Sequence, residues 1–394
     1  MADVEVKAFS REDRKLFEVF LRFPRKLHHG ERYWVPEFLA ERRRMHDPRS
    51  NPELRTLNTQ YFLAYRANEP LGRMVAFLER DSQEADAEGK RVGWFGFFEC
   101  EDDPGGALAL FDAGSRFLAE RGCTHMRGPS GFTSMTTWGM LAGGRFEDAP
   151  AVLMPWNPRH YMRLCERAKM RPATEVFAYE LTNWHWPNED LQAHAKQARD
   201  EHGIRLRPIR LERSEGFAAD VEIARELFHV AWANSWGFAP IDATRFAHLA
   251  HTMRGILHPE LCLVAEHNGE PIGFAVCLPD INQLLIHTNG KVLDLMWHMW
   301  IRKSHLKLGH ICTRARIAMV GVSPEAHGKG VEALFLERIM ESCLRHGVLT
   351  VELSWVSDST AQSHPLLQSL NEPPYKRYRI WERDLAAFAS TSTS

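Results

Sequence analysis

The chain has 394 residues, of which 44% are hydrophobic and 25% charged, a balance that indicates a globular protein of two or three domains and excludes a largely disordered or collagen-like chain. Lys and Arg number 49 against 51 Asp and Glu, so the net charge of -2 gives no reason to expect nucleic acid as a partner. The seven cysteines form no CxxC motif and no Cys/His cluster, which indicates buried thiols in a reducing compartment and no metal site.

The N-terminal residues 1–17 carry charges where a signal peptide needs an apolar core, and no run of about 18 uncharged apolar residues occurs. We therefore expect a cytoplasmic protein. Residues 293–308 combine Leu, Met and Trp with Lys, Arg and His, the composition of an interfacial helix, which predicts peripheral contact with the inner face of the membrane. A helix that packs on the protein's own core is the alternative.

Hydrophobic periodicity predicts the same succession of elements twice along the chain. In the first half it predicts a helix over residues 14–27, a hairpin over 60–67 and 72–79, a strand over 92–99, a helix over 107–122 and a short strand over 123–129. In the second half it predicts a helix over residues 221–236, a hairpin over 261–278, a strand over 316–322, a helix over 332–347 and a strand over 350–356. This pattern predicts an α/β protein made of two tandem units, each a mixed central sheet flanked by helices. The turn at Pro187 places the boundary between domains 1–186 and 187–394.

The step from strand to helix in VGVSPEAHGKGVEALF, residues 320–335, carries the most specific chemistry. A strand followed by a glycine-bearing turn and a helix N-terminus directs backbone N–H groups and the positive end of a helix dipole to one point. Gly328 and Gly330 allow close backbone approach and Lys329 adds a cation, so the loop is predicted to bind a pyrophosphate. The loop matches neither a Walker motif nor GxGxxG, which disfavours nucleoside triphosphates and dinucleotides. The predicted binding residues are Val320, Val322, His327, Gly328, Lys329, Gly330 and Val331.

This loop resembles the pyrophosphate loop of the GCN5-related N-acetyltransferase (GNAT) superfamily, in which Arg or Gln precedes two free positions, a Gly, one free position and a Gly or Ala. His327 stands at the Arg/Gln position, Gly330 at the Gly position and Glu332 where Gly or Ala is usual, so two of the three positions depart from the pattern. The resemblance implies two tandem GNAT-like units, with acyl-CoA as co-substrate in the second. It also implies that the backbone of residues 319–322 donates hydrogen bonds to the thioester.

Further stretches resemble a bacterial family of double-domain acetyltransferase-like proteins that includes bacterial ceramide synthases. They are spread over nearly the whole chain and include RYWVPEF, GFFECEDD, LMPWNPRHY, AWANSWGFAP and YKRYRIWERDL. This resemblance implies the transfer of a fatty acyl group from acyl-CoA to a sphingoid amine.

The equivalent step of the first half is acidic. Glu99, Glu101, Asp102 and Asp103 crowd the place where a pyrophosphate would lie, so the first unit is predicted to bind no CoA. Asp103 followed by Pro104 is also typical of a helix N-cap and first turn. As an alternative function, Glu99 is a candidate general base facing a cleft shared by the two halves.

Attack of an amine on a thioester needs a base, backbone donors for the oxyanion and an acid for the leaving thiolate. Asp280, in the loop after the second hairpin, is the first candidate for the base, and an Asx turn with Asn282 is its structural alternative. Tyr375 and Tyr378 are candidates for the acid, with strand packing as their alternative. The other candidate bases are Glu99, His287 and His327.

The acceptor site is predicted to be lined by Trp236, Phe238 and Asn282, although a hydrophobic core corner explains the two aromatic residues equally well. These patterns together predict an N-acyltransferase that joins an acyl group from acyl-CoA to a primary amine, either a small molecule or a lipid such as a sphingoid base. A non-catalytic tandem binding or scaffold protein and an acetyltransferase for a small polar amine are the alternatives. We expect Gly330→Asp to abolish CoA binding while leaving the melting temperature of the free protein within a few degrees.

Overall fold

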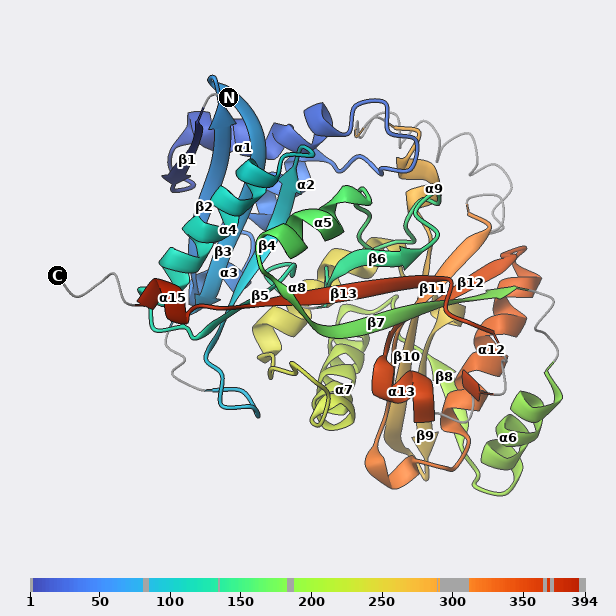
Figure 1. The fold of residues 1–394 in the computed structure, drawn as a ribbon. Helices are drawn as coiled ribbons and strands as arrows, with labels where there is room; N and C mark the ends of the chain where they lie inside the picture. The colour runs from blue at the N-terminus through green and yellow to red at the C-terminus, as the bar shows by residue number, and fades with distance from the viewer. Residues whose placement is uncertain are drawn as a thin grey trace. The chain divides into compact units, whose positions relative to one another are not determined.

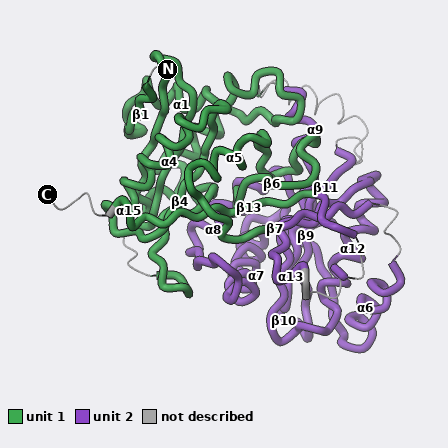
Figure 2. Tube along the Cα trace, viewed as in Figure 1, with its two compact units in different colours: residues 1–176, 289–291, 376–394 green, residues 177–288, 292–375 purple. Residues whose placement is uncertain are grey.

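The structure is a computed structural model, and it describes residues 3–80, 85–133, 135–182, 188–288, 290, 312–363, 367–368 and 372–389. The chain forms two compact units, distinguished by colour in Figure 2. Unit 1 comprises Met1–Val176, Asn289–Lys291 and Lys376–Ser394. Unit 2 comprises Phe177–Thr288 and Val292–Tyr375.

Unit 1 is a mixed sheet with helices on both faces (Figure 1). Its elements are β1 (Val4–Phe9), α1 (Arg14–Leu27), α2 (Leu39–Met45), α3 (Glu53–Thr56), β2 (Leu57–Arg66), β3 (Glu69–Glu79), β4 (Val92–Cys100), α4 (Pro104–Ala119), β5 (His125–Gly128), β6 (Met140–Gly144), α5 (His160–Arg167), the first half of β7 (Arg171–Thr182), β13 (Lys376–Asp384) and α15 (Ala386–Ala389). The strand order is β1-β2-β3-β4-β5-β13, with β6 paired to β13. Alternation along β2 places Phe62 in the core under α4 and Leu63 in the core under α1.

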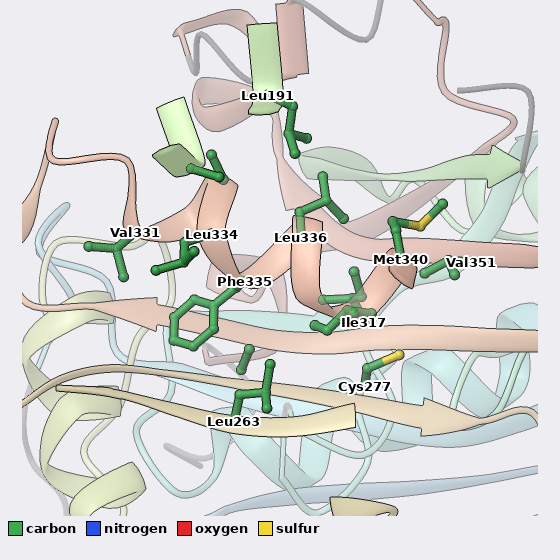
Figure 3. Close-up of a cluster of buried hydrophobic side chains, with 14 of the residues drawn as sticks. Leu191, Leu263, Cys277, Ile317, Val331, Leu334, Phe335, Leu336, Met340 and Val351 are labelled. Atoms are coloured by element: carbon green, nitrogen blue, oxygen red, sulfur yellow. The ribbon is translucent and has the colours of Figure 1, made fainter. Parts of the chain in front are cut away.

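Unit 2 repeats this plan. Its elements are the second half of β7, α6 (Glu189–Asp200), β8 (Arg205–Pro208), α7 (Ser214–Trp232), α8 (Ala243–Met253), β9 (Cys262–His267), β10 (Glu270–Pro279), α9 (Asn282–Leu285), β11 (Arg314–Val322), α12 (Val331–Arg345), β12 (Thr350–Ser357) and α13 (Asp358–Ser363). The strand order is β12-β11-β10-β9-β8. Figure 3 shows the core on one face, where Phe335 and Met340 of α12 pack with Ile317 of β11 and Leu263 of β9. Helices α7 and α8 cover the other face.

The helices and strands of the two predicted repeats are all present in the predicted order, so the tandem α/β fold is confirmed. Side-chain caps explain where several helices begin. Asp13 accepts from the backbone N of Lys15 and Leu16 at the start of α1. The predicted cap of α4 is also confirmed, because Asp103 Oδ1 accepts from the backbone N of Gly106 at 2.9 Å.

The two units differ from the predicted domains 1–186 and 187–394 in two respects. The division falls after Val176, within β7, and the last strand, β13, belongs to unit 1. β13 pairs with β5 through Trp381↔Gly128, and Trp381 and Leu385 are buried in the core of unit 1. Periodicity identifies a strand but contains no information on its pairing partner, which is why the prediction placed these residues in the second domain.

Residues 293–308, for which an interfacial helix is predicted, lie outside the described residues. In the part of the chain that the structure describes, no helix is long and apolar enough to cross a membrane.

Candidate active site

The end of β11 has a strand paired to it on one side only. β11 pairs with β12 as far as Ile317↔Leu353, whereas its pairing with β10 continues to Val322. Residues 318–322 therefore extend beyond β12, and among the described residues no strand pairs with their outer edge. The register shifts at the start of this segment, because the neighbouring residues Cys277 and Val276 of β10 pair with Ile317 and Met319 and leave Ala318 of β11 as the extra residue. The segment includes residues 319–322, the predicted backbone donors to a thioester, and that role stays a prediction.

The loop that follows β11 joins it to α12. Gly328 and Gly330 both have φ near +75°, a left-handed conformation that favours glycine, and Gly330 immediately precedes α12. Gly330 has no side chain with which to cap α12, so the first N–H groups of the helix need another acceptor. The Ser323 hydroxyl is buried and has no hydrogen-bond partner within the described residues. A buried donor without a partner in the loop and an uncapped helix start both fit a ligand with phosphate oxygens, such as CoA.

The remaining loop residues differ in how far their side chains are exposed to solvent. His327 is exposed, Lys329 is half-buried and Val331 is fully buried in the core of unit 2. His327 and Lys329 are thus the hydrogen-bond donors of the loop side chains that a phosphate could reach from solvent. Glu332 lies in the first turn of α12 and is half-buried.

Gly330 also packs against α6. A Cβ added at Gly330 would lie 2.3 Å from the carbonyl oxygen of His194, whereas a Cβ added at Gly328 would meet no atom within 4 Å. The expectation that Gly330→Asp leaves the melting temperature nearly unchanged is therefore wrong, because any side chain there collides with the backbone of α6. Gly328 is the position where a charge can be added without a collision.

Asp280 lies in a buried ion pair. Its Oδ2 accepts from Arg314 Nε at 2.6 Å, and its Oδ1 accepts from the backbone N of Asn282 at 3.2 Å, as in the alternative Asx turn. Burial raises the pKa of Asp280, and the Arg314 guanidinium opposes that rise. None of the Asp280 surface is exposed, so the carboxylate holds Arg314 in place. Its role as general base stays a prediction.

A second buried network joins β11 and β12 in the same unit. Arg316 Nε donates to Ser354 Oγ at 2.8 Å, and that hydroxyl donates to Glu352 at 2.6 Å. The Tyr375 hydroxyl donates to the other oxygen of Glu352. Tyr378 is fully buried and lies on β13, within unit 1. The two candidate acids thus belong to different units, and the acid role of each stays a prediction.

The predicted acceptor-site residues lie after α7 and in α9. Phe238 has its ring 5.7 Å from that of Phe228 and 6.2 Å from that of His229, and Trp236 is half-buried. Asn282 is buried at the start of α9. Phe238 therefore packs against α7, and contact of Trp236, Phe238 and Asn282 with an acceptor stays a prediction. Of the other candidate bases, His287 is exposed.

The equivalent strand of unit 1, β4, is covered by its own chain. β4 pairs with β5 only as far as Trp94↔Arg127, but the backbone N of Ser130 then donates to the carbonyl oxygen of Phe95 at 2.9 Å. A Cβ added at Gly96 would lie 1.9 Å from the Ser130 carbonyl oxygen. The backbone at Ser130 therefore occupies the edge that has no paired strand in unit 2. This gives a steric reason, besides the acidic residues, to expect CoA only in unit 2.

Glu99 is the second-last residue of β4 and lies in a cluster of polar side chains. Its Oε2 accepts from the Tyr161 hydroxyl at 2.6 Å and lies 2.8 Å from His28 Nε2, while Arg73 Nη2 lies 3.9 Å from Oε1. Burial acts to raise the pKa of Glu99, but His28, Arg73 and the Tyr161 hydrogen bond outweigh it, so the pKa is lowered. These partners reduce the basicity of the carboxylate, and its role as general base stays a prediction.

Sequence reasoning missed the partners of both carboxylates and the Arg316–Glu352 network. A usable signal was present, because Arg314, Arg316 and Glu352 interrupt apolar strand runs, and a charge in a buried strand needs a partner. The partner itself depends on strand pairing, which the sequence does not give.

Comparisons with known proteins define the class. Residues 221–371 match the model of the Acetyltransferase (GNAT) family. A tandem GNAT protein from the clavulanic acid biosynthesis pathway superposes with a TM-score of 0.56 at 13% identity, over 98% of this chain and 99% of that protein. The GCN5-related glucosamine N-acetyltransferase region of a fungal multi-domain GH3 β-N-acetylglucosaminidase gives 0.55 at 14% identity, over 97% of this chain and 38% of that one. The chain therefore has a tandem GNAT-like fold, and residues 221–371, within its second unit, match the GNAT family model.

Two relatives are similar over nearly the whole chain. Protein YghO of Escherichia coli K12 is 26% identical over 373 residues, which is 93% of each chain. The bacterial ceramide synthase of Caulobacter vibrioides is 27% identical over 370 residues, 93% of this chain and 94% of that protein. The predicted resemblance to double-domain bacterial proteins is thus confirmed.

Proposed function

We propose that the protein is an acyl-CoA-dependent N-acyltransferase that binds the donor in unit 2 and transfers a long-chain acyl group to the amine of a sphingoid base. The observation that carries the proposal is the edge of β11 beyond Ile317, which leads directly into the glycine-bearing loop and the uncapped start of α12. Backbone donors for a thioester and for a pyrophosphate thus follow one another within residues 318–332.

In the proposed reaction the amine nitrogen attacks the thioester carbonyl carbon. A C–N bond forms, the C–S bond breaks, and the ammonium proton passes to a base while the CoA thiolate leaves and is protonated. Backbone N–H groups of residues 319–322 stabilise the oxyanion, and His327 and Lys329 attract the phosphates. No residue of this chain needs to form a covalent intermediate.

Support for a lipid acceptor comes from the similarity to the Caulobacter protein named as a ceramide synthase, which extends over 93% of this chain. The residues predicted at the acceptor site, Trp236 and Phe238, are half-buried aromatic side chains suited to an apolar substrate.

The test has two stages. Calorimetric titration of the full chain with CoA, acetyl-CoA and palmitoyl-CoA measures donor binding, since a ligand that binds the native state can be detected directly. Release of free CoA thiol from the bound donor is then followed with sphinganine and, separately, with ethanolamine. Turnover with sphinganine supports the proposal, whereas turnover with ethanolamine alone identifies an acetyltransferase for small polar amines. Failure to bind any of the three donors would make a non-catalytic scaffold the better explanation.

A pair of variants separates the loop from general instability. Gly328→Asp places a negative charge at the proposed phosphate site and is expected to weaken CoA binding at least about tenfold, which corresponds to about 1.4 kcal/mol. Gly269→Asp is the matched control, because Gly269 lies in the β9–β10 turn of the same unit, also has a positive φ and also has no atom within 4 Å of an added Cβ. Equal CoA affinity in the two variants would move the cofactor site away from this loop.

A further inference from the structure

An apolar cavity lies inside unit 2, between α7 and α8 on one side and the sheet on the other. Its volume is about 60 Å³, and part of it is open to solvent. Its wall comes from both helices and from strands β9, β10 and β11, and includes Phe217, Ala224, Phe246, Ala250, Val276 and Met319.

The cavity wall presents no unneutralised charge. Its one charged lining residue, among those described, is Asp220. Asp220 Oδ1 accepts from Arg210 Nη2 at 2.6 Å and lies 2.9 Å from Arg207 Nη2, so its charge is compensated by two guanidinium groups. The other lining side chains are aliphatic, aromatic or methionine. A cavity wall of this chemistry offers water few hydrogen-bond partners and favours hydrocarbon.

Empty apolar volume of this kind is costly to a folded protein. Interiors normally pack as densely as organic crystals, and a void lowers stability in proportion to its volume. The opposite face of the same sheet is packed, with Leu336, Ile339 and Met340 of α12 buried against it. A void on one face of a sheet that is well packed on the other is explained more directly by a ligand than by poor packing.

Met319 connects this cavity with the proposed reaction site. It belongs to the part of β11 that extends beyond β12, and it also lines the cavity. Its pairing partner on β10, Val276, lines the cavity as well. A thioester held at this edge would therefore have its chain directed past Met319, into the space between α7, α8 and the sheet.

We propose that this cavity binds the hydrocarbon chain of a medium- or long-chain acyl-CoA and thereby selects the donor. The inference rests on the proposed function and adds to it the site that determines which acyl chain lengths the protein binds.

The test is calorimetric titration of the full chain, without amine, with CoA and with acetyl-, hexanoyl-, decanoyl- and palmitoyl-CoA. Each methylene that enters the cavity is expected to tighten binding about fourfold, which corresponds to about 0.8 kcal/mol, until the cavity is full. Ala250→Leu, on α8, fills part of the cavity and should move the point of saturation to shorter chains. Leu257→Ala enlarges the cavity and should move it to longer chains.

Ala218→Leu is the matched control, because Ala218 is exposed on α7. It should leave the chain-length profile unchanged, and all three variants should keep the affinity of the wild type for CoA and acetyl-CoA. Decanoyl-CoA binding no tighter than acetyl-CoA, or a profile that neither cavity variant shifts, would overturn the inference while leaving the proposed function intact. In the thiol-release assay with sphinganine and ethanolamine, cavity variants that change the preferred amine but not the preferred donor would assign the cavity to the acceptor and likewise overturn the inference. Failure to bind CoA itself would instead overturn the proposed function and this inference with it.

Discussion

Asp280 and Arg314 are two buried charges that stabilise the fold only as a pair. Asp280 is fully buried and Arg314 is 8% exposed, so neither charge can turn to water when the other is removed. Removing one partner of a buried ion pair is costly because it leaves an uncompensated charge, whereas removing both is much less costly. A comparison of the single and double variants therefore distinguishes a structural from a catalytic role of Asp280.

We expect Asp280→Asn to lower the free energy of unfolding by about 3–5 kcal/mol. The double variant Asp280→Asn/Arg314→Met should be more stable than this single variant, since no unpaired charge remains. Denaturant unfolding of the wild type, both single variants and the double variant measures the effect. The double variant also tests catalysis: a folded but inactive protein would support Asp280 as the base, and wild-type turnover would exclude that role.

The lowered pKa of Glu99 predicts a dependence of stability on pH. A carboxylate whose pKa is lower in the folded than in the unfolded state stabilises the fold above the ordinary carboxyl pKa, and this contribution is lost as the pH falls through the folded pKa. Glu99→Gln should therefore cost about 1–3 kcal/mol at pH 7 and flatten the loss of stability below about pH 4.5. Denaturant unfolding of the wild type and the variant, at pH 7 and at several pH values below about 4.5, is the measurement. Parallel pH profiles for the variant and the wild type would contradict the assigned partners of Glu99.

At the scale of elements, the step from β11 to α12 combines the loop proposed to bind CoA with a contact to another helix, α6. Gly328 and Gly330 share a left-handed backbone, yet only Gly330 lies against α6. Gly328→Ala should cost about 1–2 kcal/mol, the usual penalty for a side chain in this conformation. Gly330→Ala should cost more, because its Cβ would also meet the His194 carbonyl oxygen. Thermal unfolding of the two variants without ligand gives the comparison, and equal losses would show that α6 moves aside.

The elements themselves were largely predictable from the sequence. The predicted helix over residues 14–27 coincides with α1, and the predicted strand over 350–356 differs from β12 by one residue. These succeed because apolar spacing is a local property that burial on one face enforces. The glycine loop was predictable for the same reason.

What the sequence did not reveal depends on contacts between residues that are far apart in the chain. The contact of Glu99 with His28 and Tyr161 spans more than 60 residues of sequence in each case, and that of Glu352 with Tyr375 spans 23. The cavity beneath α7 and α8 is equally invisible in the sequence, because apolar residues that line a void and apolar residues that fill a core have the same pattern.

For the whole molecule, the position of β13 decides which part of the chain is self-sufficient. β13 supplies unit 1 with the strand next to β5 and with the buried side chain of Trp381. Deletion of residues 376–394 should therefore leave unit 1 sensitive to protease while unit 2 keeps its core. Deletion of residues 386–394 alone, which retains β13, is the control and should leave unit 1 protected. Limited proteolysis with mass analysis distinguishes the two, and equal protection of unit 1 in both truncated chains would show that β13 is dispensable.

The same strand sets an order of events during synthesis. The ribosome finishes the N-terminal part of unit 1 at Val176 but delivers β13 only about 200 residues later. At about 5–20 residues per second this takes about 10–40 s, during which β5 has no partner on that edge. Unit 2 is complete at Tyr375, before β13 emerges. Unit 1, which is translated first, is therefore the unit that finishes folding last. A nonsense codon just before Lys376 would leave unit 1 incomplete and unit 2 complete.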